Sequence, residues 1–92
     1  MEANRFEVEL DENITTCDCC GKTKLGRTFC IYDGYEIEVY LGRVCAKDWF
    51  GLDLSGNPYR AIERLRYKIK RMTNDEIEEL IEYIKEFALH MA

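Results

Sequence analysis

Hydrophobic and polar residues alternate in two parts of the first half of the chain. In residues 5–10, RFEVEL, three apolar side chains are separated by charged ones, a period of two that predicts a half-buried strand. Two more strands are expected at residues 27–32 and 35–41, with Asp33-Gly34 between them. Asp-Gly is favoured in the two-residue type I′ turn of a β-hairpin, so this pattern predicts an antiparallel hairpin.

The two-residue turn sets the register that we expect in this hairpin. It gives five facing pairs, which are Tyr32 and Tyr35, Ile31 and Glu36, Cys30 and Ile37, Phe29 and Glu38, and Thr28 and Val39. Because successive side chains alternate between the two faces of a sheet, this register puts Cys30 on the same face as Ile37 and Val39. We therefore expect Cys30 to be a buried core cysteine.

The second half of the chain follows a helical period instead. A short helix is predicted from Cys45 to about residue 52, and a longer one from Pro58 to residue 72, with Asn57 as its N-cap. Thr73 and Glu76 form a capping box that predicts the start of a third helix. The apolar stripes of the two longer helices comprise Ile62, Leu65, Ile69 and Met72 in the first, and Ile77, Leu80, Ile81, Ile84, Phe87, Ala88 and Met91 in the second.

The composition is that of a small globular protein whose core is near the lower size limit. The chain has 92 residues, of which 47% are hydrophobic, and we expect a single α+β domain over residues 1–92 with a helical pair at 58–91. An odd number of cysteines and a charged N-terminal stretch argue against a secreted disulfide-bonded protein. We expect a reduced, cytoplasmic protein without a membrane span, in which a metal ion compensates for the limited core.

Three cysteines have the spacing of a zinc site. Cys17 and Cys20 form a C-x-x-C sequence followed directly by Gly21, which is typical of a turn that presents two thiolates to one zinc ion. Cys45 follows at the expected start of the short helix. We interpret Cys17, Cys20 and Cys45 as Zn²⁺ ligands; the alternative is three free thiols that fill the core.

A tetrahedral zinc ion needs a fourth ligand. Side chains three residues apart on a helix face the same direction, and Asp48 lies three residues after Cys45. A carboxylate is an accepted zinc ligand, although an acidic side chain near a helix N-terminus is also favourable without a metal. Asp48 is therefore the expected fourth ligand, and the alternatives are Cys19, Cys30, His90 and water.

The order of these motifs resembles that of small treble-clef zinc-binding proteins encoded by bacteriophages and related mobile elements. The resemblance covers about residues 17–50 and rests on Cys17-x-x-Cys20-Gly21-Lys22, the Asp33-Gly34 hairpin, and Leu41-Gly42-Arg43-Val44-Cys45-Ala46-Lys47. It implies a zinc-stabilised, treble-clef-like module made of a β-hairpin and a short helix. Asp48 departs from the pattern, since a treble clef normally has a second Cys or His on this helix. Proteins of this kind often act by occupying a host complex, including as inhibitors of immunity or transcription.

Charge is strongly segregated along the chain. The net charge is −5, but residues 58–72 carry six basic side chains and one acidic one, whereas residues 73–92 carry six acidic and one basic. One stripe of the predicted helix over 58–72 contains Arg60, Arg64, Tyr67, Lys68 and Arg71. This stripe fits a nucleic-acid backbone, or alternatively pairs with the acidic helix that follows it.

The sequence favours a binding module over an enzyme. It contains no Ser-His-Asp set, no phosphate-binding glycine loop and no H-x-E element of the zinc deaminases. We expect a non-enzymatic zinc-binding protein that binds a protein partner, such as a host nucleic-acid-handling or defence complex, and regulates or inhibits it. Direct DNA or RNA binding by the basic helix is the alternative. A homodimer through the two C-terminal helices is a further expectation, because so short a chain has little surface with which to cover both apolar stripes.

Overall fold

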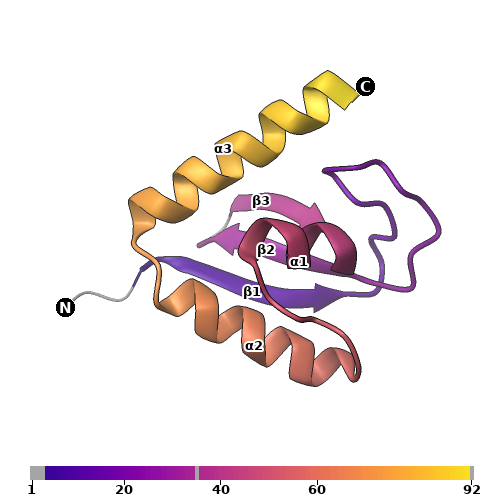
Figure 1. Cartoon of the computed structure of the whole chain (residues 1–92), viewed down its shortest axis with the longest axis horizontal. Coiled ribbons are helices and arrows are strands. Elements are labelled where there is room, and N and C mark those ends of the chain that lie inside the picture. Colours follow the sequence, from indigo (N-terminus) through magenta and orange to yellow (C-terminus); the bar gives the residue numbers. More distant parts are fainter. Residues whose placement is uncertain (1–3, 35, 92) are drawn as a thin grey trace.

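The chain forms a three-stranded antiparallel sheet and three helices (Figure 1). The computed structural model describes residues 4–34 and 36–91, with only the backbone of Met91. The elements in chain order are β1 (Phe6–Asp11), β2 (Thr28–Asp33), β3 (Glu36–Leu41), α1 (Arg43–Phe50), α2 (Pro58–Lys70) and α3 (Asn74–Met91). The predicted α+β class is confirmed, and each predicted element is present within about two residues of its expected bounds.

One apolar core lies between a face of the sheet and the helices. The alternation predicted for β1 is observed, since Phe6 and Val8 are buried and the glutamates beside them are exposed. Strands β2 and β3 contribute Phe29, Ile31, Val39 and Leu41 to the same core, and the helices contribute Ala46, Phe50, Ala61, Ile62, Leu65, Ile69, Ile77, Ile81 and Ile84. The core therefore spans all six elements of the fold.

Helix α2 covers the edge of the sheet that β1 forms (Figure 1). Arg66 Nε donates a hydrogen bond to the Val8 carbonyl at 3.0 Å, and Lys70 Nζ donates one to the Phe6 carbonyl at 3.3 Å. Carbonyl groups of an edge strand are free to pair with another chain unless something covers them. These two basic residues of α2 are thus used to protect the edge.

The register of the β2–β3 hairpin differs from the predicted one. The observed pairs are Asp33 with Glu36, Tyr32 with Ile37, Ile31 with Val39, Cys30 with Tyr40, and Phe29 with Leu41. The irregularity between Ile31 and Tyr32 is a β-bulge, which adds one residue to β3. The predicted register would have placed glutamates of β3 opposite Ile31 and Phe29 on the core face; the bulged register places Val39 and Leu41 there. Tyr35, the predicted partner of Tyr32, lies outside the described residues.

The position of Cys30 changes with this register. Cys30 is buried, as expected, with 6% of its surface exposed. It lies on the opposite face of the sheet from the core, however, between Glu9 of β1 and Tyr40 of β3. The expectation that Cys30 shares a face with Val39 is therefore wrong.

The sequence signals at the helix ends are confirmed. Asn57 Oδ1 accepts a hydrogen bond from the Tyr59 backbone N–H at 2.8 Å, so Asn57 caps α2. Thr73 and Glu76 form the reciprocal pair of hydrogen bonds of a capping box at the start of α3. None of the described helices has both the length and the hydrophobicity needed to span a membrane.

The apolar stripes of the two longer helices are covered to different extents. Ile62, Leu65 and Ile69 of α2 are buried within the chain. At the C-terminal end of α3, by contrast, Phe87 and Leu89 are 42% and 76% exposed. Within the described residues, α2 thus leaves no uncovered apolar stripe for a dimer, whereas α3 keeps apolar surface near its end.

Candidate metal centre

Residues 17–22 form a tight turn, which we call the knuckle. The Cys17 N–H donates to the Lys22 carbonyl at 3.0 Å, and the Gly21 N–H donates to the Cys17 carbonyl at 2.9 Å. Gly21 has φ +75°, in the left-handed region that residues with a side chain rarely adopt. The glycine after the C-x-x-C sequence therefore allows the chain to turn back and brings Cys17 and Cys20 together.

Asp18 fixes the knuckle to β3. Its N–H donates to the Tyr40 carbonyl at 2.8 Å, and its Oδ2 accepts a hydrogen bond from the Tyr40 N–H at 2.8 Å. Just beyond Tyr40, the backbone of Gly42 packs closely on the knuckle, where an added Cβ would lie 3.0 Å from Leu25 Cδ1 and 3.5 Å from Cys17 Cβ. This close approach directs the first turn of α1 at the two knuckle cysteines.

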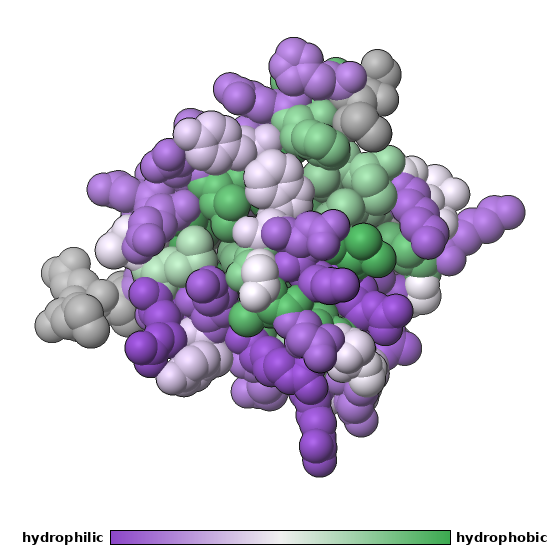
Figure 2. Space-filling view, in the orientation of Figure 1, coloured by the Kyte–Doolittle hydropathy of each residue, from purple (hydrophilic) through white to green (hydrophobic). Residues whose placement is uncertain are grey.

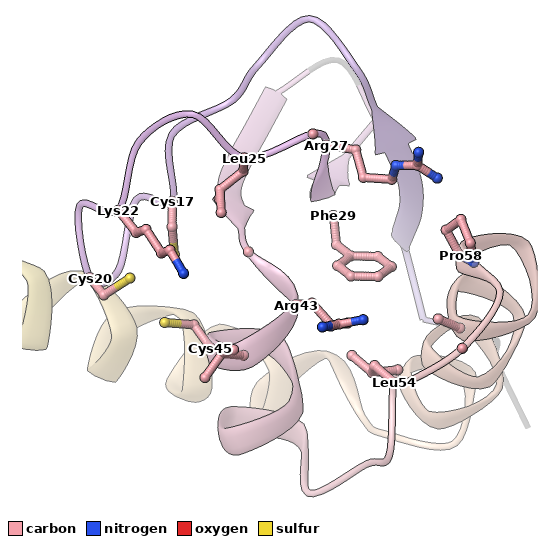
Figure 3. Close-up of a pocket in the computed structure, with 15 residues that line it drawn as sticks. Cys17, Cys20, Lys22, Leu25, Arg27, Phe29, Arg43, Cys45, Leu54 and Pro58 are labelled. Atoms are coloured by element: carbon pink, nitrogen blue, oxygen red, sulfur yellow. The ribbon is translucent and has the colours of Figure 1, made fainter.

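The sulfur atoms of Cys17, Cys20 and Cys45 all lie within 4.8 Å of one another; we call these three residues the cysteine cluster. Figure 3 shows the three sulfur atoms converging from the knuckle and from α1. With Zn–S bonds of about 2.3 Å, thiolates on a tetrahedral zinc ion are roughly 3.8 Å apart. The cluster can therefore hold a metal ion after small side-chain movements.

Backbone N–H groups favour a thiolate at Cys17. Burial alone would raise the pKa of this thiol, but the N–H groups of Cys20, Gly42 and Cys19, together with the Cys45 thiol, point at its sulfur and hold the pKa below its usual value. Burial raises the pKa of Cys45, and its hydrogen bonds to the thiols of Cys20 and Cys17 raise it further. Of Cys17 and Cys45, Cys17 is thus the one that its surroundings favour as a thiolate, which makes it the natural first ligand for a cation.

Asp48, the predicted fourth ligand, does not join this cluster. Among the described histidine, cysteine, aspartate and glutamate residues, the group stops at three. Asp48 lies one turn further along α1 and is exposed, whereas Cys17 and Cys20 approach Cys45 in the first turn of that helix. Of the alternatives, Cys30 is on the far side of the sheet and His90 is exposed near the end of α3.

Cys19 has a different partner, which the sequence did not indicate. Its sulfur accepts a hydrogen bond from Trp49 Nε1 at 3.1 Å. The Trp49 ring in turn packs edge-on against the ring of Phe87, with centroids 5.9 Å apart and an interplanar angle of 77°. Trp49 thereby links the knuckle, α1 and α3.

A pocket of about 360 Å³ opens beside the cysteine cluster. Figure 3 shows the three sulfur atoms at one end of it and Leu54 and Pro58 at the other, with the Phe29 ring and the Arg43 guanidinium between them. Lys22 and Arg27 also line the pocket. The three cations Lys22, Arg27 and Arg43 come from the knuckle, from the segment before β2 and from the start of α1. No local motif therefore indicated that they line one pocket.

The predicted basic stripe lies on α2 and is exposed along its length. The stripe comprises Arg60, Arg64, Tyr67, Lys68 and Arg71. Within the part of the chain that the structure describes, its four cations form no ion pair, so the predicted pairing with the glutamates of α3 is not observed. Arg64 donates instead to the Asp53 carbonyl at 2.7 Å, and Arg71 donates to the Tyr67 hydroxyl at 2.8 Å.

Comparison of the chain with protein-family models, with curated proteins and with solved structures gave no match. The cysteine cluster and the surfaces around it are therefore the features from which a function can be inferred.

Proposed function

We propose that this chain is a zinc-binding module in which Cys17, Cys20 and Cys45 hold one Zn²⁺ ion. The observation that carries the proposal is the convergence of three sulfur atoms, from two segments distant in sequence, within 4.8 Å of one another. The N–H groups directed at Cys17 support it further, because they stabilise the thiolate that a metal requires. Thiolate ligands in a tetrahedral arrangement favour zinc over magnesium or calcium, which prefer oxygen ligands.

We also propose that the module is of the treble-clef type. The support is the order of its parts, since a cysteine knuckle, a β-hairpin and a helix with a cysteine in its first turn follow one another along the chain. The protein supplies three ligands in this arrangement. Water or a group from a bound molecule completes the tetrahedron.

Metal analysis of the reduced, purified protein tests the zinc proposal. We expect one zinc per chain, and with cobalt in its place we expect the intense absorption of thiolate-to-cobalt charge transfer. Cys17→Ser should weaken zinc binding by at least about a hundredfold, because it removes the thiolate on which the N–H groups converge. The control is Cys30→Ser, which alters another buried cysteine on the far side of the sheet and should keep the full zinc content. A protein without zinc, or equal losses in both variants, contradicts the proposal.

We propose that the zinc has a structural and not a catalytic role. Three thiolates outweigh the charge of a divalent ion and so weaken it as a Lewis acid. Among the described residues, no histidine or carboxylate joins the cysteine cluster to act as a base. Both points favour a module that acts by binding.

The surface that best fits a protein partner is an aromatic patch formed by Trp49, Leu80, Tyr83 and Phe87. Tyr83 and Phe87 are 51% and 42% exposed, and Trp49, Leu80 and Tyr83 line one shallow hollow. Figure 2 shows pale and green surface over α3 and α1, with hydrophilic residues around it. Aromatic side chains that combine exposure with a polar rim are enriched at protein interfaces.

We propose that this aromatic patch binds a protein that presents apolar and basic side chains. Glu76, Glu79 and Lys68 line the same hollow, so its charged side chains are acidic on balance and complement a basic partner. The resemblance described above suggests a host nucleic-acid-handling or defence complex as the partner, which the module would regulate or inhibit.

Direct nucleic-acid binding is the second candidate, and it is favoured by the exposed cations of the α2 stripe, which form no ion pair within the described residues. Two double variants separate the candidates. Tyr83→Ala with Phe87→Ala should abolish capture of a protein partner from the native host, identified by mass spectrometry, whereas Arg60→Gln with Arg71→Gln, at two stripe residues that do not line the hollow, should leave it intact. If the chain binds DNA or RNA directly, the α2 variant is the defective one, and affinity falls steeply with added salt. Loss of partner capture in the α2 variant alone would overturn the assignment to the aromatic patch.

A further inference from the structure

The pocket beside the cysteine cluster differs in charge from the rest of the protein. The chain carries a net charge of −5, yet among the described residues the pocket is lined by three cationic side chains, Lys22, Arg27 and Arg43, and by no carboxylate. In Figure 3 the Lys22 ammonium lies at the end of the pocket where the sulfur atoms converge, and the Arg43 guanidinium lies further along it. A cavity lined by one sign of charge concentrates ligands of the opposite sign.

These three cations are available to a ligand. Within the described residues, none of them forms an ion pair or donates a side-chain hydrogen bond to another residue. By contrast, Arg5, Arg66, Lys70 and Lys85 are each paired with a carboxylate. Cations that are left unpaired inside a concave site are typical of anion recognition.

The rest of the pocket is apolar. The Phe29 ring and Leu54 lie along it, and Leu25 and Ala61 also contribute to its lining. Its volume of about 360 Å³ is within the usual range for small-molecule sites, which are mostly apolar with a few well-placed polar groups. A fitting ligand therefore combines an anionic group with a flat or apolar body.

The charge balance of the pocket indicates which kind of anion it binds. Here the inference rests on the proposed function, since it counts the zinc ion as bound. Three thiolates on a divalent zinc ion leave one net negative charge. The three cations then exceed it by two positive charges, which matches the dianion of a phosphate monoester near neutral pH. A carboxylate would leave one positive charge without a counter-charge.

We propose that this pocket binds a small phosphate monoester with an aromatic or apolar body. The phosphate is held by Arg43 together with Lys22, the Arg27 side chain adds positive charge from the opposite side of the pocket, and the body packs against Phe29 and Leu54. Arg43 is the central contact, because its planar guanidinium can form two parallel hydrogen bonds with phosphate oxygens. The ligand would thereby connect the knuckle, β2 and the start of α1.

Titration of the zinc-loaded protein with phenyl phosphate tests this proposal. We expect saturable binding with a Kd below about 1 mM, together with NMR shifts of the backbone amides of residues 22–29 and 42–46. Benzoate, which keeps the ring but has a single charge, should bind at least about tenfold more weakly. No saturation up to about 10 mM phenyl phosphate, or equal affinity for benzoate, overturns the proposal.

A pair of matched variants identifies the residues responsible. Arg43→Gln should weaken phenyl phosphate binding by about tenfold or more, since it removes a charge-assisted contact. Arg5→Gln makes the same chemical change just before β1, outside the pocket, and should leave the affinity unchanged. Equal losses in both variants would show a general charge effect and overturn the assignment to the pocket.

Zinc content measured on the same samples separates this inference from the proposed function. A protein that binds one zinc per chain but no phenyl phosphate overturns only the phosphate site. A protein that binds no zinc overturns the proposed function, and with it the charge balance on which the choice of phosphate depends.

Discussion

The sheet with α2 and α3, and the knuckle with the start of α1, are held together by different interactions. The first region is a continuous apolar core in which Ile31, Leu65, Ile77 and Ile84 are each less than 2% exposed. The second has few large apolar side chains and relies on backbone hydrogen bonds, on the carboxylate of Asp18 and on the cysteine cluster.

This difference indicates where the proposed zinc ion should stabilise the fold. From the length of the chain, we expected the metal to compensate for a core of limited size. Since the core spans all six elements, the proposed zinc ion should act chiefly where the core is thin, between the knuckle and α1. The sheet and the two long helices should be stable largely through their own packing, which four predictions test, from the largest expected effect to the smallest.

Truncation of the apolar core should have the largest effect. Leu65 on α2 is fully buried, so Leu65→Ala leaves a cavity and should lower the free energy of unfolding by about 3 kcal/mol. The control is Leu89→Ala on α3, which alters a side chain that is 76% exposed and should change stability by less than about 0.5 kcal/mol. Urea denaturation measures both. Similar losses of unfolding free energy in the two variants would contradict the proposal that the apolar core stabilises the sheet with α2 and α3.

Removal of the metal should act locally. On chelation of zinc, we expect the amides of residues 17–22 and 43–46 to lose roughly a hundredfold of their hydrogen-exchange protection, or about 2.7 kcal/mol. The amides of Ile31 and Leu65 should change by only a few-fold. This outcome is narrower than the loss of the whole fold that zinc modules without a core undergo. Uniform loss of protection over all residues would show that the metal supports the entire structure.

Loss of the Asp18 carboxylate should have a smaller effect. Asp18→Ala leaves the Tyr40 N–H without its acceptor at 2.8 Å and should lower stability by about 1 kcal/mol. Asp18→Asn keeps an oxygen acceptor at the same position and should recover most of that loss. Thermal unfolding of the zinc-loaded variants provides the comparison, and an unchanged Tm in Asp18→Ala would show that the bond contributes nothing.

The smallest effect concerns Cys30 and appears only at alkaline pH. Burial, together with the nearby charges of Asp11, Glu9 and Asp18, raises the pKa of Cys30 from 9.0 to about 11. The folded protein thus favours the neutral thiol. The stabilisation that comes from this preference is complete at pH values below the pKa of Cys30 in the unfolded chain. It is lost as the pH rises from about 9 to about 11.

Denaturation of the wild type and Cys30→Ala at about pH 8 and about pH 10 isolates this contribution. We expect the wild type to lose more stability between the two pH values than the variant does. Equal losses would show that the thiol titrates normally in the folded protein.

Local sequence signals predicted the elements and their ends. Asn57 with Pro58, and Thr73 with Glu76, act within a few residues of one another, and the structure contains both caps. The convergence of Cys17, Cys20 and Cys45 was also predictable, since the knuckle spacing and the position of the third cysteine in the first turn of a helix are sequence features.

Features that depend on distant contacts were missed. The bulge between Ile31 and Tyr32 arises because the core requires Val39 and Leu41 on the face of Ile31, and a turn motif carries no information about that requirement. Asp48 was expected to ligate from helical spacing alone, but the cysteine cluster forms at the first turn of α1, and Asp48, one turn further on, lies outside it. The bond from Trp49 to Cys19 spans 30 residues.

The indole of Trp49 is a built-in optical reporter. The chain contains one tryptophan, so all indole emission comes from the point where the knuckle, α1 and α3 meet. A thiol at hydrogen-bond distance quenches such emission. Any event that separates the 3.1 Å pair, such as movement of the knuckle away from α1, should therefore brighten the fluorescence of the unlabelled protein.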